Sequence, residues 1–272
     1  MTEPARQSGF AEVNGARLYY EDAGAGQPLV MLHGHLLDSR QWDEQVEPFA
    51  RHYRVVRYDA RGFGRSSRPA EPFAHYEDLR GLMALLGIER AFLMGCSGGG
   101  ATIVDFALAY PELADALILV GGSVNGFPFP AGEPPPLIVK LQEALARRDI
   151  DAAVEYGLQL WTDGPRRPDE VSQAARERTR VMMRELWGRP PSEAEARPLD
   201  PPAVGRLPAI HAPTLAIVGA ADNDLIQRIA DTVVGQVPGA RKAVIDDAGH
   251  HPNMEHPQEF NRIVLEYLRA LR

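Results

Sequence analysis

AFLMGCSGGGATIVDFALAY, residues 91–110, decides the fold, because an apolar run, a glycine-rich turn and a helical stretch follow one another in it. The apolar run at 91–95 predicts a buried strand, and the pattern at 100–110 predicts a helix. The turn between them, GCSGG at 95–99, fits the pattern G-x-S-x-G. Such a sharp turn holds its serine in a strained conformation with the hydroxyl exposed above a sheet. We therefore predict that Ser97 is a nucleophile.

The same turn allows other interpretations. A glycine-rich turn without chemistry is one of them, and a phosphate-binding loop is another. A phosphate loop is disfavoured because no G-K-[ST] follows and GCSGGG lacks the G-x-G-x-x-G spacing. Cys96 is a third alternative as nucleophile, but its side chain should face inward in this turn, as a small core residue.

Strand and helix patterns alternate on both sides of this stretch. Apolar runs predict buried strands at residues 28–32, 54–58, 91–95, 116–121, 214–219 and 242–245. Helical patterns lie at residues 39–50, 73–86, 100–110, 225–237 and 257–271. Near-continuous apolar strands separated by helices predict an α/β fold with a mostly parallel, doubly wound sheet. Alternating residues on either side of Asn14-Gly15 predict an antiparallel hairpin at one edge.

The alternation stops between residues 124 and 207, a stretch with 12 of the 23 prolines and no convincing strand. Helical patterns lie within it at 138–148, 152–161 and 171–187. We interpret residues 124–207 as a helical lid, or cap, inserted into a core formed by residues 1–123 and 208–272.

A serine nucleophile needs a base within hydrogen-bond reach, and the base needs an orienting partner. The run at 214–219 is followed by AADND, which offers Asp222 and Asp224 as the acid. The run at 242–245 is followed by DDAGHH, which offers His250 and His251 as the base, and His256 comes shortly after. We expect Asp246 and Asp247 to be solvated carboxylates of this loop. If His251 and His256 are not the base, we expect them at the surface or the pocket rim.

Five segments together resemble the α/β-hydrolase family of serine hydrolases, in order, spacing and strand context. They are HGHLLDSRQW (33–42), RYDARGFGRSSRP (57–69), GCSGGGAT (95–102), IVGAADND (217–224) and AGHHPNMEHP (248–257). The resemblance implies a triad of Ser97, Asp222 and His250, since the family usually carries its acid and its Gly-His at these positions. Small esterases and 3-oxoadipate enol-lactonases have a similar short lid and overall spacing.

The resemblance also implies the remaining parts of the site. The backbone N–H groups of His35 and Gly98 are the expected oxyanion-hole donors, and His33 is expected to be a structural histidine. Many relatives have a bulky residue where this chain has Gly98, which implies a roomier pocket floor or a looser loop. The residues expected to build a structural loop are Asp59, Arg61, Gly62, Gly64 and Ser66. The lid residues expected at the pocket roof are Leu160, Trp161, Met182, Met183, Leu186 and Trp187.

The triad implies hydrolysis of a small carboxylic ester or lactone through an acyl-enzyme on Ser97, with water and no metal or other cofactor. Three alternatives stay open. They are hydrolysis of a carbon–carbon bond in ring-cleavage products, a cofactor-free perhydrolase or haloperoxidase activity, and a ligand receptor that retains the triad. Rapid turnover of simple esters would disfavour the receptor.

Composition limits the partners of the chain. Its 272 residues carry a net charge of −8 without a long run of like charge, which disfavours nucleic acid as a partner. With Cys96 as the single cysteine, no disulfide forms within the chain. No window is apolar enough for a signal peptide or a membrane span, so we expect a cytoplasmic enzyme of small acyl substrates. The sequence leaves the oligomeric state open.

Overall fold

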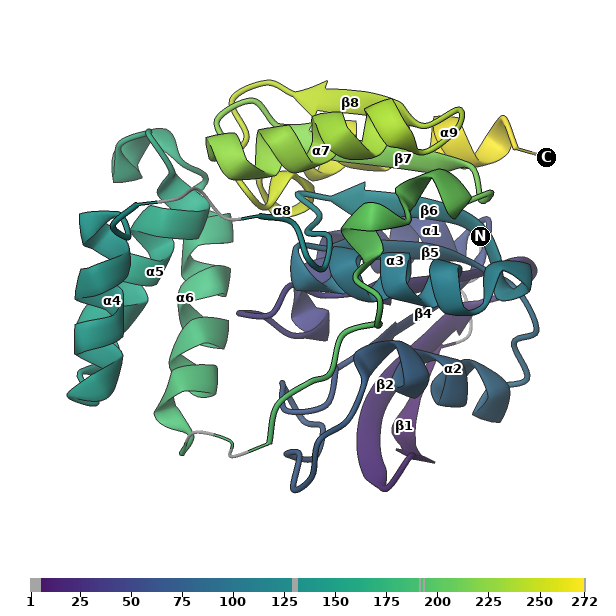
Figure 1. Ribbon diagram of the computed structural model, residues 1–272, viewed down its shortest axis with the longest axis horizontal. Helices are drawn as coiled ribbons and strands as arrows, with labels where there is room; N and C mark the ends of the chain where they lie inside the picture. Colours follow the sequence, from purple (N-terminus) through teal and green to yellow (C-terminus); the bar gives the residue numbers. More distant parts are fainter. Residues whose placement is uncertain (1–5, 129–131, 191, 193, 272) are drawn as a thin grey trace.

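The computed structural model describes residues 6–128, 132–190, 192 and 194–271 (Figure 1). Residues 1–5 and 272 of the predicted core, and 129–131, 191 and 193 of the predicted lid, lie outside the described part. The sheet has eight strands in the order β1-β2-β4-β3-β5-β6-β7-β8. These are β1 (Arg6–Val13), β2 (Ala16–Gly24), β3 (Pro28–Leu32), β4 (Arg54–Tyr58), β5 (Ala91–Cys96), β6 (Ala114–Val120), β7 (Thr214–Gly219) and β8 (Arg241–Ile245).

The sheet is parallel from β4 to β8 and antiparallel only where β2 pairs with β1 and with β4. This confirms the predicted doubly wound α/β fold. The β1–β2 hairpin turns at Asn14 and Gly15, which have φ angles of 48° and 72°. Both values suit a type I′ turn, as the Asn-Gly pair predicts.

Two layers of helices cover the sheet. The helices of the core are α1 (Asp43–Ala50), α2 (His75–Leu85), α3 (Gly98–Ala109), α7 (Asp224–Gln236), the short α8 (Pro252–Glu255) and α9 (Pro257–Arg269). Buried side chains of α2, α3 and α7 share one hydrophobic cluster with the sheet, and those of α1 and α9 share another. The helix predicted at 39–50 is divided, because a 3-10 turn capped by Asp38 (Ser39–Trp42) precedes α1.

The segment between β6 and β7 contains α4 (Pro136–Ala146), α5 (Ile150–Leu158), a π-helical turn (Gln159–Asp163) and α6 (Gln173–Gly188). Its three α-helices lie together at one end of the molecule, on the left in Figure 1. They have a small hydrophobic cluster of their own, made by Val154, Leu158 and Met183. Within the described residues of this segment there is no strand, and a single bridge joins Ala196 to Phe73.

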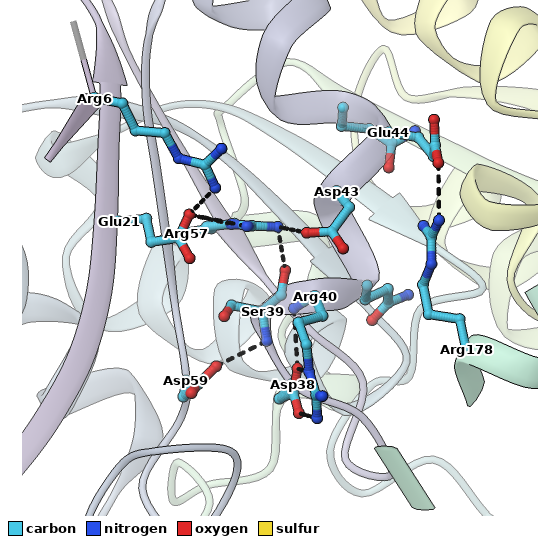
Figure 2. A network of polar contacts seen from close by, with 12 residues as sticks. Arg6, Glu21, Asp38, Ser39, Arg40, Asp43, Glu44, Arg57, Asp59 and Arg178 are labelled. Atoms are coloured by element: carbon cyan, nitrogen blue, oxygen red, sulfur yellow. Dashed lines mark hydrogen bonds and ion pairs between the residues drawn. The ribbon is translucent and has the colours of Figure 1, made fainter. Parts of the chain in front are cut away.

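A network of charged groups supports the loop that follows β3 (Figure 2). The buried Arg57 of β4 pairs with Glu21 at 2.9 Å and with Asp43 at 2.5 Å, and it donates to the Ser39 carbonyl at 2.9 Å. Ser39 N–H in turn donates to Asp59 Oδ1 at 2.8 Å. The edge hairpin, β4 and the loop are thus joined by charge-assisted hydrogen bonds, which are the stronger kind.

Across the described residues, none of the helices has the length and apolar character needed to cross a membrane.

Candidate active site

Ser97 lies in the sharp turn between β5 and α3. Its backbone has φ 48° and ψ −117°, a region that non-glycine residues rarely adopt. Hydrogen bonds hold this conformation, since Ser97 N–H donates to the Val120 carbonyl at 3.0 Å and the Ser97 carbonyl accepts from Ser123 N–H at 2.9 Å. The strand and the helix pass so close that a Cβ on Gly95 would lie 2.7 Å from Gly100 N, so glycine is needed there. The turn has the geometry expected for an exposed nucleophile.

The acid and base candidates meet at the same edge of the sheet, because parallel strands end there together. His250 Nδ1 lies 2.8 Å from Asp222 Oδ2, and both side chains are buried. Asp222 also accepts a hydrogen bond from Asn223 N–H at 2.8 Å, which fixes the carboxylate. The alternative acid, Asp224, is the exposed first residue of α7. The geometry therefore places Asp222 and not Asp224 against the imidazole.

The other polar residues of the His250 loop take two different positions. Asp246 and Asp247 are exposed, as predicted. The expectation that His251 lies on the surface or the pocket rim is wrong, because it is only 3% exposed and its ring centroid lies 5.1 Å from that of His250. Burial, with a smaller contribution from the neighbouring His250, lowers the pKa of His251 well below its ordinary value.

Cys96 is the last residue of β5 and is buried in the hydrophobic cluster that the sheet shares with α1 and α9, where burial raises the pKa of its thiol to about 12. A thiol that resists ionisation is a poor nucleophile. The position of Cys96 therefore agrees with a core residue and not with the alternative nucleophile.

The loop after β3 brings one free backbone donor to the Ser97 turn, and the turn itself supplies a second. Within the described part of the chain, the N–H groups of His35 and Gly98 donate no hydrogen bond. This loop passes close to the turn, because a Cβ built on Gly34 would lie only 3.4 Å from Ser97 Cβ. Unused N–H groups beside a nucleophile can stabilise a developing oxyanion.

His33 has the structural role that the sequence predicts. Its Nε2 accepts a hydrogen bond from Ala60 N–H at 2.9 Å, which leaves the proton on Nδ1, 2.8 Å from the Gly34 carbonyl. Asp59 accepts from Ser39 N–H and, at 2.7 Å, from Arg65 N–H. The predicted scaffold loop therefore holds the donor-bearing loop in place.

A cavity of about 530 Å³ opens beside His35, between the core and the helices α4 and α6. Its walls combine aromatic and aliphatic side chains with arginines, among them Phe63, Phe73, Trp187, Arg68, Arg148 and Arg189. Ser97, His250 and Trp161 are not part of this lining. Its size suits a small organic ligand.

The lid residues predicted at the pocket roof occupy different places. The Trp161 ring lies beside His250, with centroids 5.1 Å apart, and Leu186 and Trp187 line the 530 Å³ cavity. Met182 and Met183 do not form a roof surface, because they are buried in separate hydrophobic clusters at 2% and 0% exposure. Leucine and methionine at helical spacing give no sequence signal that separates packing residues from lining residues.

The sequence interpretation missed a buried network of amides. Gln41 Oε1 accepts from Gly34 N–H at 2.9 Å, and Asn253 Nδ2 donates to the Gln41 carbonyl at 2.9 Å. Gln45 Nε2 donates to the Asn253 carbonyl at 3.0 Å. These three residues are 0% exposed and join the loop of His35 to the segment after His250. The sequence signal that could have indicated this network is the position of Gln41 and Gln45 on the inward face of the helical pattern at 39–50.

A second missed element joins the segment between β6 and β7 to the His250 loop. Arg166 Nη1 pairs with Glu255 Oε2 at 2.7 Å, and Arg166 also donates to the Asp247 carbonyl. Glu255 Oε1 accepts from Gly249 N–H at 2.8 Å, next to His250. Nothing in the sequence joins these residues, because 89 positions separate Arg166 from Glu255.

Comparison with known proteins agrees with this arrangement. The model of the alpha/beta hydrolase fold family matches residues 27–257. A 2-hydroxy-6-oxononadienedioate/2-hydroxy-6-oxononatrienedioate hydrolase of Burkholderia vietnamiensis is 33% identical over 264 residues, which cover 93% of this chain and 91% of the relative.

Two solved structures are also similar. Est816, an N-acyl homoserine lactone degrading enzyme, has a TM-score of 0.75 at 26% identity, covering 95% of this chain and 100% of its own. A thermophilic esterase from Thermogutta terrifontis has a TM-score of 0.75 at 25% identity, covering 97% and 99%. The family match spans most of the sheet and the candidate site, and this chain is therefore a hydrolase that belongs to the α/β-hydrolase fold family.

Proposed function

We propose that the protein is a serine hydrolase that cleaves a small carboxylic ester or lactone, with Ser97 as nucleophile, His250 as base and Asp222 as orienting acid. The observation that carries the proposal is the buried 2.8 Å contact between His250 Nδ1 and Asp222 Oδ2 at the sheet edge where Ser97 occupies its strained turn. A carboxylate on Nδ1 leaves Nε2 as the nitrogen that accepts a proton.

Each group has a defined part in the proposed mechanism. Ser97 Oγ attacks the acyl carbonyl while His250 Nε2 takes its proton, and the N–H groups of His35 and Gly98 stabilise the oxyanion. Collapse of the tetrahedral intermediate expels the alcohol, which receives the proton from His250. Water activated by His250 then attacks the acyl-enzyme and releases the acid, while Asp222 stabilises the imidazolium.

The 530 Å³ cavity supports an acyl group that carries a carboxylate. Among the described residues, Arg68, Arg148 and Arg189 form no ion pair with a carboxylate and donate instead to backbone carbonyls. Unpaired guanidinium groups beside the aromatic ring of Trp187 suit a small apolar acid. In this proposal the arginines bind the far end of the substrate, and residues 124–207 are the lid over it.

A second candidate is hydrolysis of a carbon–carbon bond, which the names of the relatives favour. The substrate named for the Burkholderia vietnamiensis relative is a hydroxy-oxo diacid without an ester group. Hydrolysis of such a compound has to break the carbon–carbon bond beside its keto group. Ser97, His250 and Asp222 would serve this reaction too, and its diacid substrates would also suit the arginine-lined cavity.

The proposal is tested with the Ser97→Ala variant. We expect it to lose p-nitrophenyl ester hydrolysis and labelling by a fluorophosphonate, since removal of a nucleophile costs orders of magnitude in rate. Ser8→Ala is the matched control, because Ser8 is exposed on the edge strand β1. Normal turnover and labelling of Ser97→Ala would show that the nucleophile assignment is wrong.

A substrate panel then separates the two candidates. Lactones and monoesters of dicarboxylic acids are compared with vinylogous diketo acids of the ring-cleavage type, each at equal concentration. A higher kcat/KM for the esters or lactones supports the first candidate, and a higher value for the diketo acids supports the second. Arg148→Met is expected to raise KM for the monoester of a diacid but not for its uncharged diester.

A further inference from the structure

The imidazole of His35 and the backbone of Gly98 are packed directly against each other. A Cβ on Gly98 would lie 2.5 Å from His35 Cδ2, and closer still to Cγ and Nδ1, so no other residue fits at position 98 while the ring stays in place. Phe63 stacks on the same imidazole with ring centroids 5.6 Å apart and planes 19° apart. The ring is thus clamped between the Ser97 turn and the scaffold loop.

The clamped ring has hydrogen-bonding capacity that the protein does not use. Among the described residues, neither ring nitrogen of His35 has a hydrogen-bond partner, and the residue is exposed. It lines both the 530 Å³ cavity and a second cavity of about 150 Å³ that also includes Gly98 and Thr102. Polar groups in a concave site that lack protein partners are the groups that a ligand or water satisfies.

The surroundings of the ring keep it neutral. Gly98 and Phe63 pack against the ring, and this partial desolvation, with a smaller contribution from His33, lowers the pKa of His35 although the residue keeps an exposed surface. His75, whose centroid lies 5.3 Å away, has a lowered pKa for the same reason. A neutral imidazole offers one N–H donor and one acceptor nitrogen.

We propose that the His35 imidazole is a specificity-determining group that hydrogen-bonds an oxygen substituent on the carbon next to the reacting carbonyl, in a 2-hydroxy or 2-oxo acyl group. The inference rests on the proposed function, in which the N–H of the same residue binds the carbonyl oxygen. One residue then contacts the carbonyl through its backbone and the neighbouring carbon through its side chain. Gly98 is glycine because this ring needs the space above it.

The first test compares two esters that differ by one hydroxyl, p-nitrophenyl lactate and p-nitrophenyl propanoate. His35→Phe keeps the ring volume and the backbone N–H but loses both nitrogens. We expect the loss of kcat/KM to be about tenfold larger for the lactate than for the propanoate, as for one neutral hydrogen bond. An equal loss for both esters would mean that the His35 side chain only lines the site and does not recognise the hydroxyl group. Propanoate hydrolysis that Ser97→Ala abolishes checks the proposed function separately.

A binding measurement makes the second test independent of turnover. Lactate and propanoate are titrated by calorimetry into Ser97→Ala and into Ser97→Ala/His35→Phe. Tighter binding of lactate that disappears in the double variant supports the inference. Equal affinity of both acids for Ser97→Ala would overturn it, whichever bond the enzyme hydrolyses.

The third test addresses the packing of the ring. Gly98→Ala is expected to lower kcat more than about tenfold for both esters, because its methyl group displaces the imidazole and the N–H beside it. Adding His35→Gly should restore propanoate hydrolysis but not the preference for lactate. Gly235→Ala is the control, since a Cβ there meets nothing within 4 Å. No rescue by His35→Gly would refute the reciprocal packing.

Discussion

The candidate catalytic side chains of this protein lie at the ends of strands. Ser97 is strained by a turn that two hydrogen bonds to neighbouring segments maintain. Backbone strain of this kind persists only where the surrounding structure fixes it, and it is common at functional sites. The residue next to it, Gly98, has no side chain, and the His35 ring fills the space that a Cβ would need.

The choice between the two aspartates is a prediction at this scale. Asp222→Asn should lower kcat by about 10³- to 10⁴-fold, because an amide favours the wrong imidazole tautomer and does not stabilise the imidazolium. Asp224→Asn should change kcat by less than about threefold, since Asp224 is exposed at the start of α7. Steady-state kinetics on one ester, with circular dichroism as a folding check, measure both. A larger loss in Asp224→Asn would reverse the assignment.

At the scale of elements, β2 and β4 support the loop that bears His35. Burial by itself raises the pKa of Glu21, but hydrogen bonds and charges from Arg6 and Arg57 outweigh it and leave this pKa below its usual value. The folded protein therefore favours ionised Glu21. This contribution to stability is fully present above the unfolded pKa of about 4.5 and is lost as the pH falls through the lower folded value.

Glu21→Gln tests this contribution. We expect the free energy of unfolding to fall by about 1–3 kcal/mol at pH 7, because Arg57 loses a buried charged partner. The difference from the parent protein should shrink as the pH falls below about 4.5 and Glu21 becomes protonated. Urea unfolding at several pH values measures it. Glu47→Gln is the control, because its pair with Arg51 is exposed on both sides and worth little. A difference that does not depend on pH would contradict the linkage.

At the scale of the whole molecule, the segment between β6 and β7 is joined to the core by ion pairs of two kinds. Arg166 and Glu255 form a pair whose side chains are 13% and 1% exposed. Arg40 and Glu185 form a second pair that is 33% and 50% exposed. The first pair adjoins the His250 loop through Gly249 N–H, so it connects the segment between β6 and β7 to the candidate base.

The two pairs provide a matched comparison. Glu255→Gln should lower stability by about 3 kcal/mol and also reduce kcat, because it leaves Arg166 without its buried partner and loosens the His250 loop. Glu185→Gln should change stability by less than about 1 kcal/mol and leave kcat unchanged. Thermal unfolding and ester kinetics on both variants check this. Equal effects would mean that burial of the first pair does not matter.

The sequence by itself determined the order of strands and helices and the residues that follow each strand. Local patterns carry this information, since apolar runs, the Asn-Gly turn and the glycines around Ser97 act on neighbouring residues. The boundaries moved where a cap intervened, as at Asp38 before α1. Ser97 and the acid and base candidates on the two later loops were all named from these patterns.

Only the tertiary structure decided which candidates meet. It places Asp222 rather than Asp224 against His250, buries His251 and Met182, and joins Arg166 to Glu255. These contacts depend on how strands distant in the sequence align at one edge of the sheet and on how the segment between β6 and β7 packs against the core. Local periodicity does not encode contacts between residues that are far apart in the sequence. Polar residues and methionines also give the same local pattern whether they pack in a core, support a loop or line a cavity.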